Sequence, residues 1–252
     1  YIRALDTLHS SIRPITILRQ GAQHNSLTFG RYAETSPPSA PSAASMPRFV
    51  SATQLRIDLK EGHWEQAEHY LFSGGRPLLE KSTTGLPVLG RVERAILSKL
   101  RTMRAEDWAR LPDSGQAEGL PRRLERAGRT CASLQEFFNL VKVKRFTHAR
   151  LRRLVLWAYL GIKLQDIPGS PPYLRVLGMT PRGRTLLRTM KEHAALPLLT
   201  KPAHVTQLSG VVQRLFELEA RCTDLYDLCF EIPPSPGREW RTGPVVLEDR
   251  TV

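Results

Sequence analysis

The sequence predicts an α/β segment followed by a larger, mainly α-helical region. The stretch IRPITIL at 12–18 is apolar and rich in β-branched residues, which is typical of a buried strand. Between residues 64 and 108, and again in most of the remaining chain, apolar residues recur with helical spacing. The 252 residues are enough for one large domain or two modest ones, each with its own core.

Before residue 115, a short amphipathic helix is expected to open the chain and to lead into the strand at 12–18. The segment 33–47 is rich in Pro, Ser and Ala, which cannot hold a helix or a central strand, so we expect a loop there. Ser51 is suited to be the N-cap of the helix that starts in SATQLR. Further helices are expected over 64–108.

The turn-rich sequence LPDSGQAEGLP at 111–121 marks an expected border. Beyond it, Thr147 and Thr180 are the expected N-caps of two helices, and Pro181 suits the first helical position, where an N–H is not needed. The other expected elements are short strands at 173–178 and 196–201, a long helix at 211–230 and an extended tail from Pro233.

Positive charge is concentrated in one region of the chain. The formal net charge is +13, and residues 115–201 carry 17 Lys and Arg against 5 Asp and Glu, a net of +12. Residues 1–114 carry a net of +4 and residues 202–252 a net of −3. Concentrated positive charge favours a polyanionic partner such as nucleic acid. We therefore expect three parts: 1–62, a helical connector at 63–114 and a basic helical domain at 115–252.

Composition argues against a membrane protein and against a disulfide framework. No run of 18 or more apolar residues is present, so we expect no transmembrane helix, no membrane partner and a cytoplasmic location. Cys131, Cys222 and Cys229 lack metal-site spacing and are expected to be reduced thiols. No nucleophile motif is recognised, so the sequence indicates no catalytic residue and no metal ligand.

The segment VKVKRFTHARLRRLVLWAYLGI at 141–162 joins two patterns. From Leu151 onwards its apolar residues form one stripe, as in a core helix. Cations crowded at a helix N-terminus repel one another and oppose the helix macrodipole, which is unfavourable without an anion. The alternatives are a solvated charged face and, for Arg150, a structural role. We expect six residues to bind a phosphate backbone: Lys142, Lys144, Arg145, Arg150, Arg152 and Arg153.

The sequence SATQLR at 51–56 suits a phosphate group. Ser51 and Thr53 place hydroxyls in the first helical turn, and Arg56 adds a guanidinium one turn later. Arg19 and Gln20 follow the expected strand, at the end where ligands of open α/β sheets bind. The alternatives are plain helix capping for Ser51 and a surface ion pair for Arg19.

Several sequence blocks occur in the order and rough spacing of the bacterial tRNA(Met) cytidine acetate ligases. The most specific blocks are KVKRFTHARLRR at 142–153 and YLRVLG at 173–178. SATQLR, LSKLRTM, EGLPRRLERA, LPLLTK and TDLYDLCF agree as well. The chain therefore resembles this family of nucleotidyltransferase-like proteins over nearly its whole length.

The resemblance implies an enzyme that uses ATP, with Mg²⁺ on its phosphates, to activate acetate as acetyl-adenylate. The enzyme then acetylates N4 of the wobble cytidine in elongator methionine tRNA. By the same resemblance, Arg19 and Gln20 match an ATP-contacting pair, and Ser51, Thr53 and Arg56 match the S-x-T-x-x-R phosphate motif. Residues 1–62 would then be the C-terminal part of a Rossmann-like ATP-binding domain, and 115–252 a tRNA-binding domain.

This chain departs from the family at one motif. The N-terminal His-x-x-His-type ATP motif has no counterpart in the sequence, so we expect an N-terminally truncated chain that is inactive alone. Three other functions stay open: a non-catalytic RNA-binding module, a different nucleotidyltransferase and a DNA-binding helical protein. The +12 region argues against a nucleotidyltransferase with a small substrate, because such a substrate needs no extended basic surface.

Overall fold

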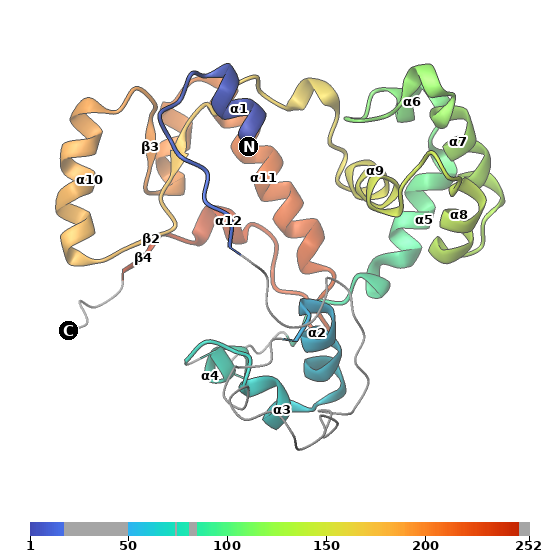
Figure 1. The fold of residues 1–252 in the computed structure, drawn as a ribbon, viewed down its shortest axis with the longest axis horizontal. Coiled ribbons are helices and arrows are strands. Elements are labelled where there is room, and N and C mark those ends of the chain that lie inside the picture. The colour runs from blue at the N-terminus through green and yellow to red at the C-terminus, as the bar shows by residue number, and fades with distance from the viewer. Residues whose placement is uncertain (18–49, 74, 81–84, 247–252) are drawn as a thin grey trace, which may run out of the picture. The chain divides into compact units, whose positions relative to one another are not determined.

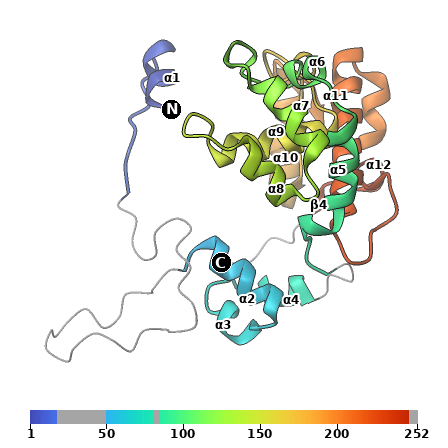
Figure 2. The same cartoon turned by 90° about the vertical axis from the view of Figure 1, so that its right-hand side faces the viewer.

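The structure, a computed structural model, describes residues 1–17, 50–73, 75–80 and 85–246. The chain forms two compact units, Tyr1–Ser82 and Thr83–Val252, which Figures 1 and 2 show from two directions. The expected borders, after residues 62 and 114, differ from this one. The assignment of 1–62, 63–114 and 115–252 to an ATP-binding part, a connector and a tRNA-binding part stays a prediction.

The described part of the first unit is helical. It contains α1 (Ile2–Thr7), α2 (Ala52–Glu61), α3 (Trp64–Glu68) and α4 (Gly75–Glu80). Ser51 is the N-cap of α2, as expected, because its hydroxyl accepts a hydrogen bond from the backbone N–H of Gln54 at 3.1 Å. Gly62, in the left-handed conformation with φ +82°, ends α2 and lets the chain turn into α3.

The expectation of a buried strand at 12–18 is wrong for the residues that the structure describes. Residues 12–17 form no strand, and Ile15 and Ile17 are 86% and 91% exposed. A β-branched segment forms a strand only where a neighbouring strand pairs with it, and the described part of this unit contains no strand. Residue 18 and the expected loop at 33–47 lie outside the described residues.

The second unit contains two hydrophobic cores. The larger core is formed by helices between residues 89 and 160, with Trp108 and Phe137 stacked at its centre, their ring centroids 6.1 Å apart. Residues on both sides of position 114 pack into this core. The elements are η1 (Leu89–Val92), α5 (Glu93–Thr102), α6 (Ala105–Ala109), η2 (Gln116–Glu118), α7 (Leu120–Thr130), α8 (Leu134–Val141) and α9 (His148–Leu160).

Helix α9 confirms the interpretation of its sequence. The hydroxyl of Thr147 accepts a hydrogen bond from the backbone N–H of Arg150 at 3.3 Å, so Thr147 is the N-cap. Gly161, with φ +70°, ends the helix. The residues at helical spacing that are buried are Leu151, Leu154, Val155 and Ala158.

The second core lies in the C-terminal half of this unit, around Phe216 and Leu199. The expected helix after Thr180, the long helix after residue 210 and both expected strand regions are confirmed, although each strand has only two residues. The expected extended tail instead contains a short helix and a strand. The elements are η3 (Leu164–Asp166), β1 (Leu174–Arg175), β2 (Gly178–Met179), α10 (Pro181–His193), β3 (Leu198–Leu199), η4 (Pro202–Gln207), α11 (Gly210–Asp227), α12 (Arg238–Arg241) and β4 (Val245–Val246).

The strands pair in parallel, β1 with β3 and β2 with β4. Helix α10 connects the first pair, since parallel strands need a crossover. None of the helices in the described ranges is long and apolar enough to span a bilayer.

Candidate nucleic-acid interface

A tight turn before α9 presents the first cations of the basic segment. Val143 and Phe146 form an isolated antiparallel bridge, and the backbone N–H of Phe146 donates to the carbonyl of Val143 at 3.0 Å. Phe146 is buried in the larger core, which anchors the turn. Lys144 and Arg145, the two residues between the bridge partners, are therefore held at the surface, and both are exposed.

Arg150 is the inward-facing cation of the segment. Its Nη1 donates to Oε2 of Glu118 at 3.0 Å, and its Nε lies 3.2 Å from Oδ1 of Asp113. The guanidinium also lies over the ring of Phe146, 5.7 Å from the centroid. Its side chain is only 16% exposed. Arg150 contacts two carboxylates and an aromatic ring and thereby attaches α9 to the 113–118 loop. This is the structural role that the sequence analysis gave as the alternative to phosphate binding.

Arg145 and Arg153 are tied to the same loop but stay accessible. Nη2 of Arg145 donates to the carbonyl of Glu118 at 2.9 Å, and its guanidinium lies 4.8 Å from the centroid of Phe146. Nη2 of Arg153 donates to Oδ2 of Asp113 at 3.1 Å. A carbonyl does not neutralise a cation, so Arg145 keeps its full charge, whereas Arg153 shares Asp113 with another arginine.

Lys144 and Arg152 are the least engaged members of the segment. Both side chains are exposed, and no ion pair or hydrogen bond from either is found within the described part of the chain. The Nζ of Lys142 donates to the neighbouring carbonyl of Val143 at 2.9 Å, which again leaves its charge uncompensated. The exposed side chains of Lys144 and Arg152 are available to an anion, and the half-buried Lys142 adds its positive charge beside them.

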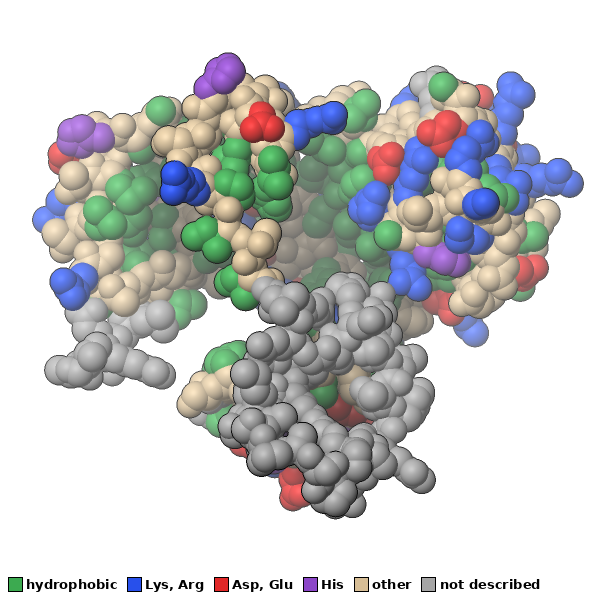
Figure 3. Space-filling model, viewed as in Figure 1, with side chains coloured by type: hydrophobic (Ala, Val, Ile, Leu, Met, Phe, Trp, Pro, Cys, Tyr) green, Lys and Arg blue, Asp and Glu red, His purple; other side chains and the backbone are tan. Residues whose placement is uncertain are grey.

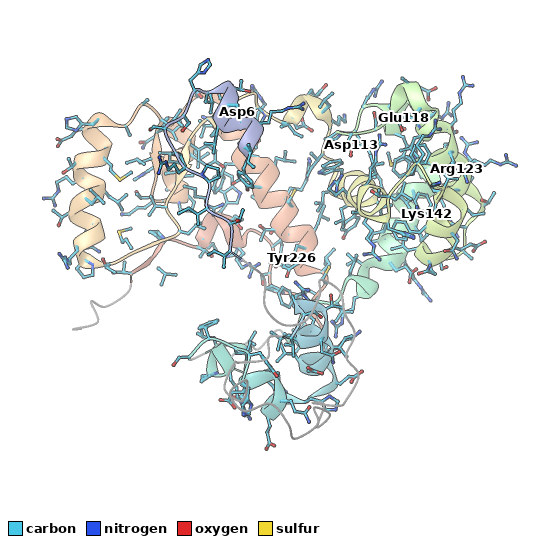
Figure 4. All side chains as sticks on the ribbon, in the orientation of Figure 1. Asp6, Asp113, Glu118, Arg123, Lys142 and Tyr226 are labelled. Atoms are coloured by element: carbon cyan, nitrogen blue, oxygen red, sulfur yellow. The ribbon has the colours of Figure 1, made fainter. Side chains whose placement is uncertain are left out.

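The structure brings three of the six predicted residues, Arg145, Arg150 and Arg153, together at the 113–118 loop. Lys142, Lys144 and Arg152 lie in the same turn and helix, and no contact from them to that loop is found among the described residues. We call Lys142, Lys144, Arg145, Arg150, Arg152 and Arg153 the hairpin cluster. Asp113 and Glu118 pair with Arg150 and Arg153, so the six cations of the hairpin cluster exceed the carboxylates paired with them by four charges. Figure 4 labels Asp113, Glu118 and Lys142 on this part of the second unit, and Figure 3 shows Lys and Arg side chains gathered over α7, α8 and α9.

The positive surface continues onto α7, which the sequence-based expectation did not include. Arg122, Arg123 and Arg126 lie on this helix and are exposed. A signal for them was present in the sequence, because LPRRLERA places two arginines four residues apart on one helical face inside the +12 region.

The residues predicted for ATP lie in the first unit, at the start of α2. Ser51 is buried, and its hydroxyl is used as the helix cap. Thr53 is half-buried in the first turn, and the exposed Arg56 donates from Nη1 to the carbonyl of Ala52 at 3.2 Å. These three side chains share one helix start; Arg19 and Gln20 lie outside the described residues.

One polar side chain beside this helix start was not anticipated. Gln54 is buried, and its Nε2 donates to Oδ1 of the buried Asp58 at 2.8 Å. Its Oε1 has no hydrogen-bond partner within the described part of the chain. No sequence signal distinguishes this glutamine from an exposed one.

The described residues hold neither a reactive thiolate nor a grouped set of metal ligands. Cys131, Cys222 and Cys229 are free, as expected, and burial raises the pKa of each thiol. No three His, Cys, Asp or Glu side chains in the described ranges are grouped so as to hold a metal ion.

A family model described as HIGH Nucleotidyl Transferase matches residues 1–238. The chain belongs to the HIGH nucleotidyl transferase family. This membership agrees with the resemblance that the sequence blocks indicate.

Two relatives of this HIGH nucleotidyl transferase chain carry the same name. The tRNA(Met) cytidine acetate ligase of Kosmotoga olearia is 32% identical over 253 residues, which cover 92% of this chain and 54% of the relative. The protein of the same name from Thermotoga petrophila is 30% identical over 259 residues, covering 96% and 56%. The chain thus spans about half the length of the curated relatives it matches.

Solved structures also match. The crystal structure of apo Thermotoga maritima TmcAL matches with a TM-score of 0.80 and 25% identity, covering 98% of this chain and 59% of that one. The structure of the same protein bound with alpha-thio ATP matches with a TM-score of 0.71 and 26% identity, covering 80% and 53%. The expected nucleotidyltransferase-like fold is therefore confirmed for this HIGH nucleotidyl transferase chain, and the chain is mainly helical.

Proposed function

We propose that this chain is part of an ATP-dependent acetate ligase that forms N4-acetylcytidine at the wobble position of elongator tRNA(Met). The names of its relatives support this activity. The hairpin cluster supports the proposal on the structural side, because six cations within one turn and helix, with only two carboxylates paired to them, suit a nucleic-acid backbone. tRNA is a cytoplasmic substrate, so a cytoplasmic location is part of the proposal.

Within the hairpin cluster we assign different roles to different residues. Lys144 and Arg152 contact tRNA phosphates directly, because neither has a carboxylate partner in the described part of the chain. Lys142, Arg145 and Arg153 add charge while their side chains stay tied to the turn and the loop. Arg150 holds the site in shape, since it is largely buried between two carboxylates.

ATP is assigned to the start of α2, with Ser51, Thr53 and Arg56, together with Arg19 and Gln20. A helix N-terminus with nearby hydroxyls and a guanidinium suits phosphate oxygens, which is the chemistry that these side chains supply. A TmcAL structure with alpha-thio ATP supports ATP binding in the family. Magnesium accompanies the phosphates, since Mg²⁺ is commonly held by nucleotide oxygens and few protein ligands.

The proposed reaction has two steps. An acetate oxygen attacks the α-phosphorus of ATP, pyrophosphate leaves, and acetyl-adenylate forms. The N4 amine of the cytidine then attacks the acetyl carbonyl, AMP leaves, and the amine loses a proton. This sequence predicts pyrophosphate release that requires acetate, and transfer of labelled acetate to RNA that requires both ATP and tRNA.

A pyrophosphate-release assay with and without acetate tests the chemistry, using the whole ligase of which this chain is proposed to be part and an unmodified tRNA(Met) transcript. Release that requires acetate, followed by labelled acetyl transfer to the transcript, is the expected result. Tight tRNA binding with no acetate-dependent release would mean that this chain acts as a non-catalytic RNA-binding module. Release that requires a different acid would indicate another nucleotidyltransferase.

Filter binding at several salt concentrations tests the RNA site. The double variant Lys144→Ala, Arg152→Ala is expected to bind tRNA more weakly, with a salt slope that is smaller by about 1 for each lost phosphate contact. The control variant is Arg94→Ala, Arg214→Ala, which removes two exposed arginines from α5 and α11, outside the hairpin cluster. Equal slopes for the two variants would contradict the assignment.

A further inference from the structure

A groove on the surface of α7 lies beside the hairpin cluster. Its volume is about 430 Å³, within the range of pockets that hold ligands of small-molecule size. The lining has no carboxylate and no aromatic ring. The residues that line it are Arg122, Arg123, Arg126, Ala127, Thr130 and Leu140.

The positive charge of this groove is not neutralised from within α7. The only acidic residue of the helix is Glu125, and both of its carboxylate oxygens are engaged elsewhere. Oε1 pairs with Nη2 of Arg129 at 2.6 Å, and Oε2 accepts from the backbone N–H of Ala105 at 3.0 Å. Arg122 and Arg126 are exposed, and neither has an ion pair among the described residues.

Arg123 joins the groove to the hairpin cluster. Its Nη2 donates to the carbonyl of Leu140 at 2.7 Å and its Nε to the carbonyl of Val141 at 2.9 Å. These bonds cap the C-terminal end of α8, where free carbonyls carry partial negative charge. Lys142 follows directly in the sequence, and Figure 4 shows it with Arg123 on the same part of the unit. The groove and the hairpin cluster therefore lie next to each other.

We propose that this groove binds the phosphodiester backbone of RNA, one step along the strand from the phosphates held by the hairpin cluster. Arg122 and Arg126 are four residues apart on the helix, so both guanidinium groups point to the same side and can each donate to phosphate oxygens. The inference rests on the proposed function, because it takes the same tRNA as its ligand.

The lining favours a backbone over a free nucleotide or a base. A site that selects a base reads its edge with polar groups and usually stacks it on an aromatic ring, and the six lining residues offer neither an aromatic ring nor a carboxylate or amide side chain. Leu140 is 42% exposed and gives a ribose an apolar surface beside the two guanidinium groups. Binding here is accordingly independent of sequence and sensitive to salt.

Arg123 acts through other groups rather than on the RNA. Since its guanidinium is bonded to two carbonyls, it is a positioning residue that fixes the end of α8 and the following turn. Arg122 and Arg126 have no such bonds within the described part of the chain, so replacing them leaves the fold intact.

The test compares the salt dependence of tRNA binding in the intact chain and in the variant Arg122→Ala, Arg126→Ala. The magnitude of the slope is expected to fall by about 2, one for each lost phosphate contact, with weaker binding at every salt concentration. The control variant Arg94→Ala, Arg214→Ala loses the same charge away from the groove and is expected to keep the slope of the parent. A milder variant, Arg126→Gln, is expected to lower the slope by about 1.

The outcomes separate this inference from the proposed function. If the groove variants keep the parental slope while Lys144→Ala, Arg152→Ala loses part of it, the groove inference is overturned and the hairpin cluster stands. If neither set changes the slope, both fail. Equal competition by duplex DNA at the same phosphate concentration would also overturn the inference, because it would show a general polyanion surface rather than an RNA site.

Discussion

Arg150 and Glu118 form an ion pair, with 3.0 Å between Nη1 and Oε2, that joins the first turn of α9 to the loop before α7. The same guanidinium also reaches Asp113, and the two carboxylates belong to the segment 111–121 that the sequence indicated as a border. This segment is therefore part of the support of the basic surface. The pair explains why a cation lies near a helix N-terminus, where it is otherwise unfavourable.

Replacing Arg150 with alanine is expected to lower the free energy of unfolding by about 1 kcal/mol, because Glu118 loses its partner and the largely buried Arg150 side chain is removed, while Asp113 keeps Arg153. Thermal unfolding followed by circular dichroism measures this change. The matched control is Arg152→Ala, two residues along the same helix and exposed, which is expected to stay within about 0.5 kcal/mol of the parent. Equal losses in the two variants would contradict the structural role of Arg150.

Arg56→Ala is expected to weaken ATP binding about tenfold, or about 1.4 kcal/mol, while the salt slope of tRNA binding stays unchanged. Arg56 is exposed, and among the described residues its guanidinium bonds only its own helix, at Ala52. Calorimetric titration with ATP gives the affinity. The control Lys60→Ala removes an exposed cation from the other end of α2. An unaltered affinity for ATP removes Arg56 from the proposed site.

Gly128→Ala is expected to destabilise the second unit by about 1–3 kcal/mol through overpacking. A Cβ on this glycine would lie 2.7 Å from the carbonyl oxygen of Leu100, so α5 and α7 can approach this closely only without a side chain. A lower midpoint in a thermal melt measures the change. Gly169→Ala is the control, because a Cβ there meets no atom within 4 Å. A variant at Gly128 as stable as its parent would show that α5 moves without cost.

The basic segment was predictable because its signals are local. A threonine cap, an apolar stripe and the charges before it are all read within 22 residues, and the structure confirms the cap and the stripe. It was less predictable which of these cations forms ion pairs within the protein. Arg150 and Arg152 look alike in the sequence, and only the folded loop at 113–118 distinguishes them.

The fold was harder to predict where a segment becomes a strand only by pairing with a second segment. The stretch at 12–18 has strand composition, yet residues 12–17 form no strand, because a strand is defined by its neighbour rather than by its own residues. Turn residues in the segment 111–121 suggested the border after residue 114, and that border stays a prediction. Trp108 and Phe137 pack together across it.

Glu239 provides a prediction on pH dependence. Partial burial opposes its ionisation, but hydrogen bonds from Thr223, at 2.7 Å, and from Arg175, together with the charge of Arg175, hold its pKa below the ordinary value of 4.5. A lowered pKa means that the ionised carboxylate stabilises the fold. Its contribution is complete above pH 4.5 and is lost as the pH falls through the lowered pKa.

Glu239→Gln is therefore expected to lower the free energy of unfolding at pH 7 by about 1–2 kcal/mol, since the amide cannot replace a charged acceptor. The difference between variant and parent should shrink as the pH falls below 4.5, because the parental carboxylate becomes protonated. Urea unfolding at several pH values measures it. A difference that stays constant down to pH 3 would contradict this role of the Glu239 charge.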